Sequence, residues 1–204
     1  TIEALPKIMS KKGIGFFFFF EVQVLDSLLE NPKRPYLAVL GGAKVSDKIA
    51  VIEKLLDIVD GFIIGGAMAY TFLKAKGVPV GKSLVETDKL RYSAEMIERI
   101  AARDKTLLLP VDHVVANSID ATEGRVTSGV EIDEGYLGLD IGPKSISQFR
   151  TAIQEAATVF WNGPMGVFEN PAFSKGTFSI AESLANSSCT KIVGGGDSAA
   201  AAEA

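Results

Sequence analysis

After Pro35 the sequence repeats one pattern: a short apolar run, a cluster of glycines, and then ten or more residues with helical spacing. The apolar runs are continuous rather than alternating, which is typical of strands that are covered on both faces. A parallel sheet with helices on either side meets that requirement. The sequence therefore predicts a three-layer, Rossmann-like α/β domain with a mainly parallel β-sheet.

The individual elements follow from the same pattern. Short runs rich in Val, Ile and Leu predict strands over Tyr36–Leu40, Gly61–Ile64, Thr106–Leu109, Val114–Ala116, Val159–Trp161 and Lys191–Val193. Helical spacing predicts helices over Val45–Asp57, Ala67–Ala75, Asp88–Arg103, Ser145–Ala156 and Phe173–Ala185. Residues 117–142 show no clear period and predict a loop-rich insertion with room for a small hairpin.

Length and charge limit the class of protein. The chain has 204 residues, enough for one compact domain or for one domain with an appended segment. Its net charge of -4 gives no overall positive field that would favour nucleic acid or an anionic membrane. One cysteine cannot form an internal disulfide, and one histidine cannot build a His-rich zinc site. We therefore expect a soluble, cytoplasmic protein with neither nucleic acid nor membrane as partner.

Five consecutive phenylalanines, Phe16–Phe20, stand apart from this composition. The run is far shorter than the roughly 20 residues that a transmembrane helix needs. No small-residue cleavage site separates it from Glu21. We interpret the run as part of a buried helix or wedge. Because a turn cluster of Asn and Pro follows, we expect a linker or interdomain helix region over residues 1–30 and the main domain over residues 31–204.

Four glycine clusters follow predicted strands. They read Gly41-Gly42-Ala43-Lys44, Gly65-Gly66-Ala67-Met68, Asn162-Gly163-Pro164 and Gly194-Gly195-Gly196-Asp197. Ligands of parallel sheets bind outside the carboxyl ends of the strands. Glycine lets a ligand approach the backbone, and the helix N-termini that follow can hold an anion. Together the clusters favour a phosphorylated ligand, although each alone also suits an ordinary strand-to-helix turn.

Three charged residues beside these clusters each allow two interpretations. Lys44 and Lys48 lie four residues apart, which places both ammonium groups on one face of the predicted helix. They either hold a polyphosphate or form a solvated face. Asp197 stands at the start of the last predicted helix. It either binds a magnesium ion that bridges phosphates or caps the helix, and spacing alone does not decide.

Two further patterns carry less weight. Gly194, Gly196 and Ala199 fit the dinucleotide fingerprint, but the acidic residue expected about 20 positions later falls beyond the sequence. A dinucleotide-dependent oxidoreductase is therefore a weak alternative. His113 beside Asp112 suggests a proton relay, yet a lone histidine in a strand is more often a structural hydrogen-bonding residue.

Five segments resemble one known family. GGAKVSDK, IIGGAMAYTFLKA, LGLDIGP, VFWNGPMGVFE and VGGGDSAAA are similar to the nucleotide-binding C-terminal half of phosphoglycerate kinases, in its bacterial form most of all. They occur in the same order, from about Asn31 onward. The resemblance implies a domain that binds Mg-ATP or Mg-ADP. It also implies a part in phosphoryl transfer between ATP and 3-phosphoglycerate, in glycolysis.

The resemblance assigns roles motif by motif. Lys44 would stabilise the phosphoryl group in flight, Lys48 the nucleotide phosphates, and Asp197 would hold Mg²⁺. Glu169 would accept hydrogen bonds from the ribose hydroxyls. The adenine pocket would be lined by Gly42, Ala43, Gly65, Gly66 and Leu139. The nucleotide cleft and its phosphate contacts would involve Asn162, Gly163, Pro164, Gly195, Gly196 and Ser198.

The sequence also departs from the family pattern. The family has an N-terminal domain that binds 3-phosphoglycerate, and its chain continues past GGGDSA to a further phosphate loop; neither has a counterpart here. Leu5-Pro6 is followed by KIMSKKGIGFFFFFE instead of a segment such as GFLMEKE. We expect nucleotide binding with little turnover, and a monomer when the protein is complete. The alternative is a non-catalytic fragment or interaction module that associates through Phe16–Phe20.

Overall fold

The computed structural model describes residues 32–203. The expected linker region at residues 1–30, with its phenylalanine run, lies outside the described residues. The described elements belong to one compact unit that begins at Arg34. Within residues 32–203, no helix is both long enough and apolar enough to cross a membrane.

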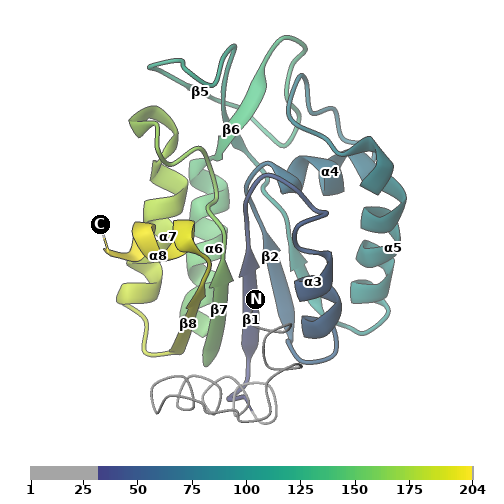
Figure 1. The fold of residues 1–204 in the computed structure, drawn as a ribbon, viewed down its shortest axis with the longest axis vertical. Coiled ribbons are helices and arrows are strands. Elements are labelled where there is room, and N and C mark those ends of the chain that lie inside the picture. The colour runs from purple at the N-terminus through teal and green to yellow at the C-terminus, as the bar shows by residue number, and fades with distance from the viewer. Residues whose placement is uncertain (1–31, 204) are drawn as a thin grey trace, which may run out of the picture. The chain divides into compact units, whose positions relative to one another are not determined.

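A five-stranded parallel sheet forms the centre of this unit (Figure 1). Its strand order is β3-β2-β1-β7-β8, and every neighbouring pair runs parallel. The strands are β1 (Tyr36–Leu40), β2 (Gly61–Ile64), β3 (Thr106–Leu108), β7 (Thr158–Asn162) and β8 (Thr190–Gly194). The predicted strands are confirmed to within one residue at each end.

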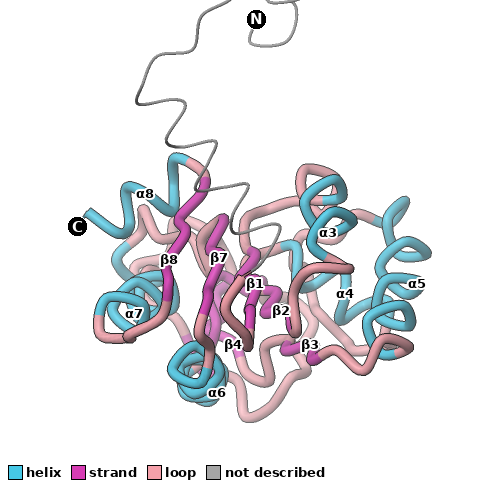
Figure 2. The backbone as a smooth tube through the Cα atoms, turned by 90° about the horizontal axis from the view of Figure 1, so that it is seen from below, coloured by secondary structure: helices cyan, strands magenta, loops and turns pink. Residues whose placement is uncertain are grey.

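Helices cover both faces of this sheet, which confirms the three layers (Figure 2). In β1 the side chains of Tyr36, Ala38 and Leu40 face one layer, and those of Leu37 and Val39 face the other. The first layer contains α3 (Ile49–Leu55), α4 (Met68–Ala75) and α5 (Leu90–Ala101), the last preceded by the short 3-10 helix η1 (Thr87–Lys89). The second contains α6 (Pro143–Glu155), α7 (Lys175–Ala185) after η2 (Pro171–Phe173), and α8 (Gly196–Glu203).

The helix expected from Val45 begins only at Ile49. Val45 is fully buried in the first layer, and its carbonyl accepts a hydrogen bond from the Lys48 N–H (2.9 Å). A tight turn therefore replaces the first helical turn. Lys44 lies in the loop before this turn and Lys48 immediately precedes the helix, so the prediction that they share one helix face was wrong.

A second, antiparallel sheet lies beyond the carboxyl ends of the central strands (Figure 1). Its order is β5-β4-β6, with β4 at His113–Ala116, β5 at Arg125–Val126 and β6 at Leu137–Ile141. The strand predicted over Val114–Ala116 exists but does not belong to the parallel sheet, because it pairs with β5 and β6. The loop prediction for residues 117–142 missed β6.

This second sheet buries two titratable side chains. His113 is fully buried; its Nε2 hydrogen-bonds to the Val130 carbonyl (3.1 Å), and its ring packs against Tyr70. Burial lowers the pKa of His113 to about 4, so the ring stays neutral. This confirms the structural interpretation of the histidine. Burial raises the pKa of Asp140 to about 7, although Gly176 N–H donates a hydrogen bond to its carboxyl group (2.7 Å).

We expect acid to destabilise the protein through His113. The unfolded imidazole binds a proton below its ordinary pKa of 6.5, whereas the folded one resists protonation down to about 4. The stability that the neutral ring contributes is therefore lost as the pH falls across that interval. Urea unfolding of the wild type and His113→Gln should show the wild type losing about 2 kcal/mol relative to the variant between about pH 7 and pH 5.

Asp140→Asn serves as the opposite control. Because the folded pKa of Asp140 is raised, its contribution is present at low pH and is lost as the pH rises through about 7. As the pH falls from about 7 to about 5, the wild type should therefore gain stability relative to Asp140→Asn. Parallel pH curves for the wild type and His113→Gln would contradict the burial argument.

Candidate functional site

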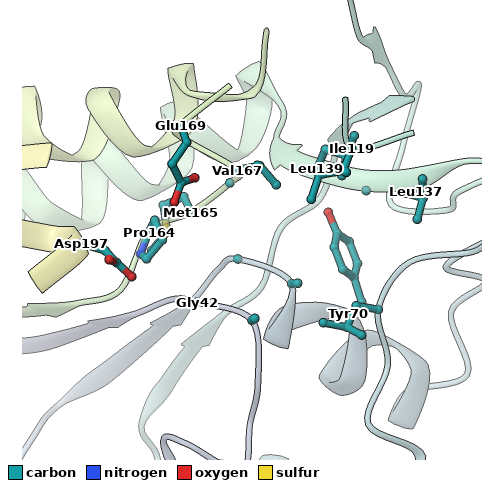
Figure 3. A pocket seen from close by; sticks show the side chains of 16 residues that line it. Gly42, Tyr70, Ile119, Leu137, Leu139, Pro164, Met165, Val167, Glu169 and Asp197 are labelled. Carbon is teal, nitrogen blue, oxygen red and sulfur yellow. The ribbon is translucent and has the colours of Figure 1, made fainter. Parts of the chain in front are cut away.

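A cavity of about 330 Å³ opens at the carboxyl ends of the central strands. Its walls come from the loops after β1, β2 and β7, from α4 and from β6 (Figure 3). The sixteen lining residues are Gly42, Ala43, Gly66, Ala67, Tyr70, Leu84, Ile119, Leu137, Gly138, Leu139, Pro164, Met165, Gly166, Val167, Glu169 and Asp197. The predicted clustering of strand-end loops at one site is thus present.

The loops after β1, β2 and β7 are joined by backbone hydrogen bonds. The N–H groups of Gly41 and Gly42 donate to the carbonyls of Asn162 and Pro164, both at 2.9 Å. The Gly66 N–H donates to the Met165 carbonyl at 3.1 Å. These bonds require close backbone contact, so the floor of the cavity consists of main chain rather than side chains.

Polar groups gather at one end of the cavity. Lys48 Nζ donates a hydrogen bond to the side-chain oxygen of Asn162, the last residue of β7. Partial burial lowers the pKa of Lys48, and the negative charges of Asp47 and Asp197 oppose this shift. The Asp197 carboxylate lines the cavity at the same end. A cation, an amide and an anion thus meet where β7 and β8 end.

The N-terminus of α8 lies at this polar end. Asp197 is the second residue of α8, two positions past the N-cap, so the geometry does not support the capping interpretation. The first N–H groups of a helix have no intrahelical partner and favour an anion. The buried Ser198 hydroxyl accepts a hydrogen bond from the Gly163 N–H (2.6 Å), which ties α8 to the loop after β7.

The opposite end of the cavity is mainly apolar. Figure 3 shows Tyr70 extending between the glycine floor and the β6 side chains Leu137 and Leu139. Leu84, Ile119 and Val167 are further apolar lining residues. Small floor residues and aliphatic walls leave room for a flat apolar group.

Hydrogen bonds from α7 hold the wall that follows β7. Thr177 Oγ1 accepts from the N–H groups of Met165 and Gly166, at 3.0 and 3.3 Å. Asp140 packs so closely against Gly166 that a Cβ there would stand 2.3 Å from its Oδ1. The Val167 N–H donates to the Leu139 carbonyl (2.9 Å), which joins this wall to β6.

The cavity offers few ligands for a metal ion. Among residues 32–203, no three His, Cys, Asp or Glu side chains come together as a metal site. Asp197 and the exposed Glu169 provide the two carboxylates among the lining residues. Mg²⁺ in phosphate sites commonly takes one or two carboxylates and completes its shell with phosphate oxygens and water. The donor set therefore fits a magnesium ion that arrives with a phosphorylated ligand.

A family model described as phosphoglycerate kinase matches residues 1–204. The chain belongs to the phosphoglycerate kinase family. It spans about half the length of the curated relatives it matches. A phosphoglycerate kinase of Bdellovibrio bacteriovorus is 69% identical over 205 aligned residues, which cover 100% of this chain and 51% of that protein. One of Clostridium novyi is 53% identical, covering 95% of this chain and 49% of that protein.

Solved structures of the phosphoglycerate kinase family share this fold. The structure of phosphoglycerate kinase from Coxiella burnetii superposes with a TM-score of 0.88 at 41% identity, covering 93% of this chain and 49% of that chain. The crystal structure of the Pyrococcus horikoshii enzyme gives a TM-score of 0.78 at 29% identity, covering 93% of this chain and 48% of that chain.

The residues expected from the resemblance to phosphoglycerate kinases fall into three groups. The cavity itself is lined by Gly42, Ala43, Gly66, Leu139, Pro164, Glu169 and Asp197. Next to its polar end lie Lys48, Asn162, Gly163, Gly195, Gly196 and Ser198. Two residues stand apart: Lys44 is exposed in the loop after β1, and Gly65 is buried against Met165 Sδ, which a Cβ would approach to 2.3 Å.

Sequence reasoning missed several of the apolar lining residues. Tyr70 and Met165 lie inside the quoted motifs IIGGAMAYTFLKA and VFWNGPMGVFE, but helical spacing and apolar character assign such residues to the core. Leu84 and Ile119 come from segments without a motif. A signal for Leu137 did exist, because Leu137, Leu139 and Ile141 alternate along β6.

We expect Gly66→Ala to disrupt the joined loops. Gly66 has a φ of +66°, and a Cβ there would stand 2.5 Å from both Gly42 N and Gly42 O. The substitution combines left-handed strain of about 1–2 kcal/mol with a backbone clash. Urea unfolding should show a large loss of stability.

Gly77→Ala is the matched control. Gly77 has a φ of +81° and nothing within 4 Å of an added Cβ, so only the left-handed strain applies. Gly66→Ala should lower the free energy of unfolding by at least about 2 kcal/mol more than Gly77→Ala. Equal effects of the two substitutions would refute the close-contact argument.

Proposed function

We propose that this chain is the nucleotide-binding half of a phosphoglycerate kinase and binds Mg-ADP and Mg-ATP. The observation that carries the proposal is one cavity with a polar end beside the α8 N-terminus and an apolar end beside β6. A nucleotide has the same division, with charged phosphates at one end and a flat base at the other. Membership of the family supports the same assignment.

The polar end suits the phosphates. Lys48 supplies a positive charge, and the N–H groups of Gly196, Asp197 and Ser198 in the first turn of α8 supply hydrogen-bond donors. Asp197 is the carboxylate that would hold Mg²⁺ between phosphate oxygens. Gly195 and Gly196 let the phosphates approach the backbone. Asn162 positions the Lys48 ammonium group, and Gly163 and Pro164 shape the loop beneath it.

The rest of the cavity suits the nucleoside. The base would lie over Gly42, Ala43 and Gly66 and under Leu139, with Gly65 supporting the floor from below. Glu169 is exposed at the cavity wall, where its carboxylate can accept hydrogen bonds from ribose hydroxyls. Figure 3 places Glu169 and Asp197 on the same side of the cavity, opposite Tyr70.

In a complete protein, the proposed reaction is reversible phosphoryl transfer between ATP and 3-phosphoglycerate in glycolysis. Such transfer depends mainly on positioning and charge neutralisation. Lys44, in its exposed loop, would stabilise the transferring phosphoryl group, and Lys48 would hold the nucleotide phosphates. The acceptor would bind to the half of the family's chain that these 204 residues do not cover. We therefore propose that the isolated chain binds nucleotide with little turnover.

Two alternatives have weaker support. A dinucleotide oxidoreductase would place a pyrophosphate at the start of α8, where the Asp197 carboxylate would repel it unless a metal intervened. An interaction module that uses Phe16–Phe20 falls outside the described residues. It is compatible with a nucleotide site elsewhere in the chain.

Calorimetric titration tests the proposal. ADP should bind the 204-residue chain in the presence of Mg²⁺, more weakly in EDTA, and NAD should not bind. Lys48→Met keeps the apolar stem but removes the charge, so it should weaken Mg-ADP binding about tenfold or more. Asp197→Asn should reduce the difference between the Mg²⁺ and EDTA titrations.

Lys54→Met is the matched control for Lys48→Met. Lys54 is an exposed lysine in the last turn of α3, away from the cavity lining. Its replacement should leave Mg-ADP affinity unchanged. Absence of ADP binding under every condition would refute the proposed function, and NAD binding in place of ADP would favour the oxidoreductase.

A further inference from the structure

Polar side-chain groups are unevenly distributed around the cavity. Of the sixteen lining residues, three carry a polar group on the side chain: Tyr70, Glu169 and Asp197. The two carboxylates lie together at one end (Figure 3). The Tyr70 hydroxyl is therefore the single polar side-chain group that residues 32–203 contribute to the apolar end of the cavity.

Tyr70 is held firmly in place. The residue is 4% exposed and lies in the first turn of α4, where its ring packs against the buried His113 ring at 5.2 Å between centroids. Its hydroxyl lies so close to Gly138 that an added Cβ there would stand 2.1 Å from it. A group fixed by packing on both sides is preorganised for a directional contact.

We propose that the Tyr70 hydroxyl determines base specificity by donating a hydrogen bond to a ring nitrogen of a bound purine. The inference rests on the nucleotide-binding function proposed above. With the phosphates at the α8 end, a base would reach the apolar end with its edge toward Tyr70. The aliphatic walls can pack against the two faces of the base, but they offer no hydrogen bond to its polar edge. Without the Tyr70 hydroxyl, that edge would lose hydrogen bonds to water and gain none from the protein.

The hydroxyl is suited to act as a donor. Burial raises the pKa of Tyr70, and the negative charge of Asp140 adds to this shift, so the hydroxyl keeps its proton at neutral pH. The ring nitrogens N1, N3 and N7 of adenine each have a lone pair and no proton, which makes them fitting acceptors. Pyrimidine bases are smaller and would leave the hydroxyl without this partner.

The test is a double-mutant cycle between the protein and the ligand. The wild-type chain and Tyr70→Phe are titrated with Mg-ADP and with 1-deaza-, 3-deaza- and 7-deaza-ADP, each of which lacks one ring nitrogen. Tyr70→Phe should weaken Mg-ADP binding about three- to tenfold. One of the analogues should bind the wild type more weakly than ADP does, by a similar factor. The same analogue should bind Tyr70→Phe as tightly as ADP binds that variant, because the variant already lacks the contact.

Two controls separate base recognition from a general effect on the fold. Magnesium pyrophosphate has no base, so its affinity should be the same for the wild type and Tyr70→Phe. Tyr92→Phe removes a hydroxyl on α5 outside the cavity lining and should leave Mg-ADP affinity unchanged.

The outcomes distinguish the two proposals. Equal ADP affinity of the wild type and Tyr70→Phe would overturn the role of Tyr70 but leave nucleotide binding intact. The role of Tyr70 would also be overturned if each analogue weakened binding by the same factor in the wild type and in Tyr70→Phe. It would be overturned as well if Tyr70→Phe weakened pyrophosphate binding as much as ADP binding. Failure of the wild type to bind ADP at all would overturn both proposals.

Discussion

Backbone contact among three loops determines the geometry of this domain at the carboxyl ends of its central strands. The loops after β1, β2 and β7 come so close that N–H and carbonyl groups pair directly between Gly41 and Asn162, and between Gly42 and Pro164. Side chains would hold the loops apart: a Cβ on Gly41 would stand 2.1 Å from the Pro164 carbonyl oxygen. The first role of these glycines is therefore to let the loops pack closely together. The shallow main-chain floor is a consequence of the same packing.

The walls of the cavity depend on that floor and on the second sheet. β6 would have no partner without β4; Thr177 accepts hydrogen bonds from the wall after β7, and Asp140 joins β6 to α7. Asp140 illustrates the cost of this arrangement, because a buried carboxyl group must hold backbone N–H groups while burial disfavours its charge. The antiparallel sheet thus belongs to the architecture of the cavity, although it lies outside the parallel core.

The parts of the structure that the sequence predicted are those set by local pattern. β1 is buried on both faces and reads as a continuous apolar run, and the glycine clusters mark the strand ends. The predictions were wrong where contacts between residues far apart in the sequence determine the local structure. Val45 belongs to the core and so delays the start of α3, which separates Lys44 from Lys48. Gly138 and Asp140 interrupt the apolar residues of β6, so the strand was not predicted. The burial of this strand depends on β4 and on Tyr70.

The partner of Lys48 is an amide, Asn162, and not a carboxylate. A carboxylate at this position would neutralise the lysine and would itself repel a phosphate. The amide oxygen of Asn162 fixes the ammonium group without cancelling its charge. Burial already disfavours that charge, and the negative charges of Asp47 and Asp197 only partly offset the burial. An anion between Lys48 and the start of α8 would therefore offset the unfavourable burial of the ammonium charge, and a ligand with several negative charges would offset it most.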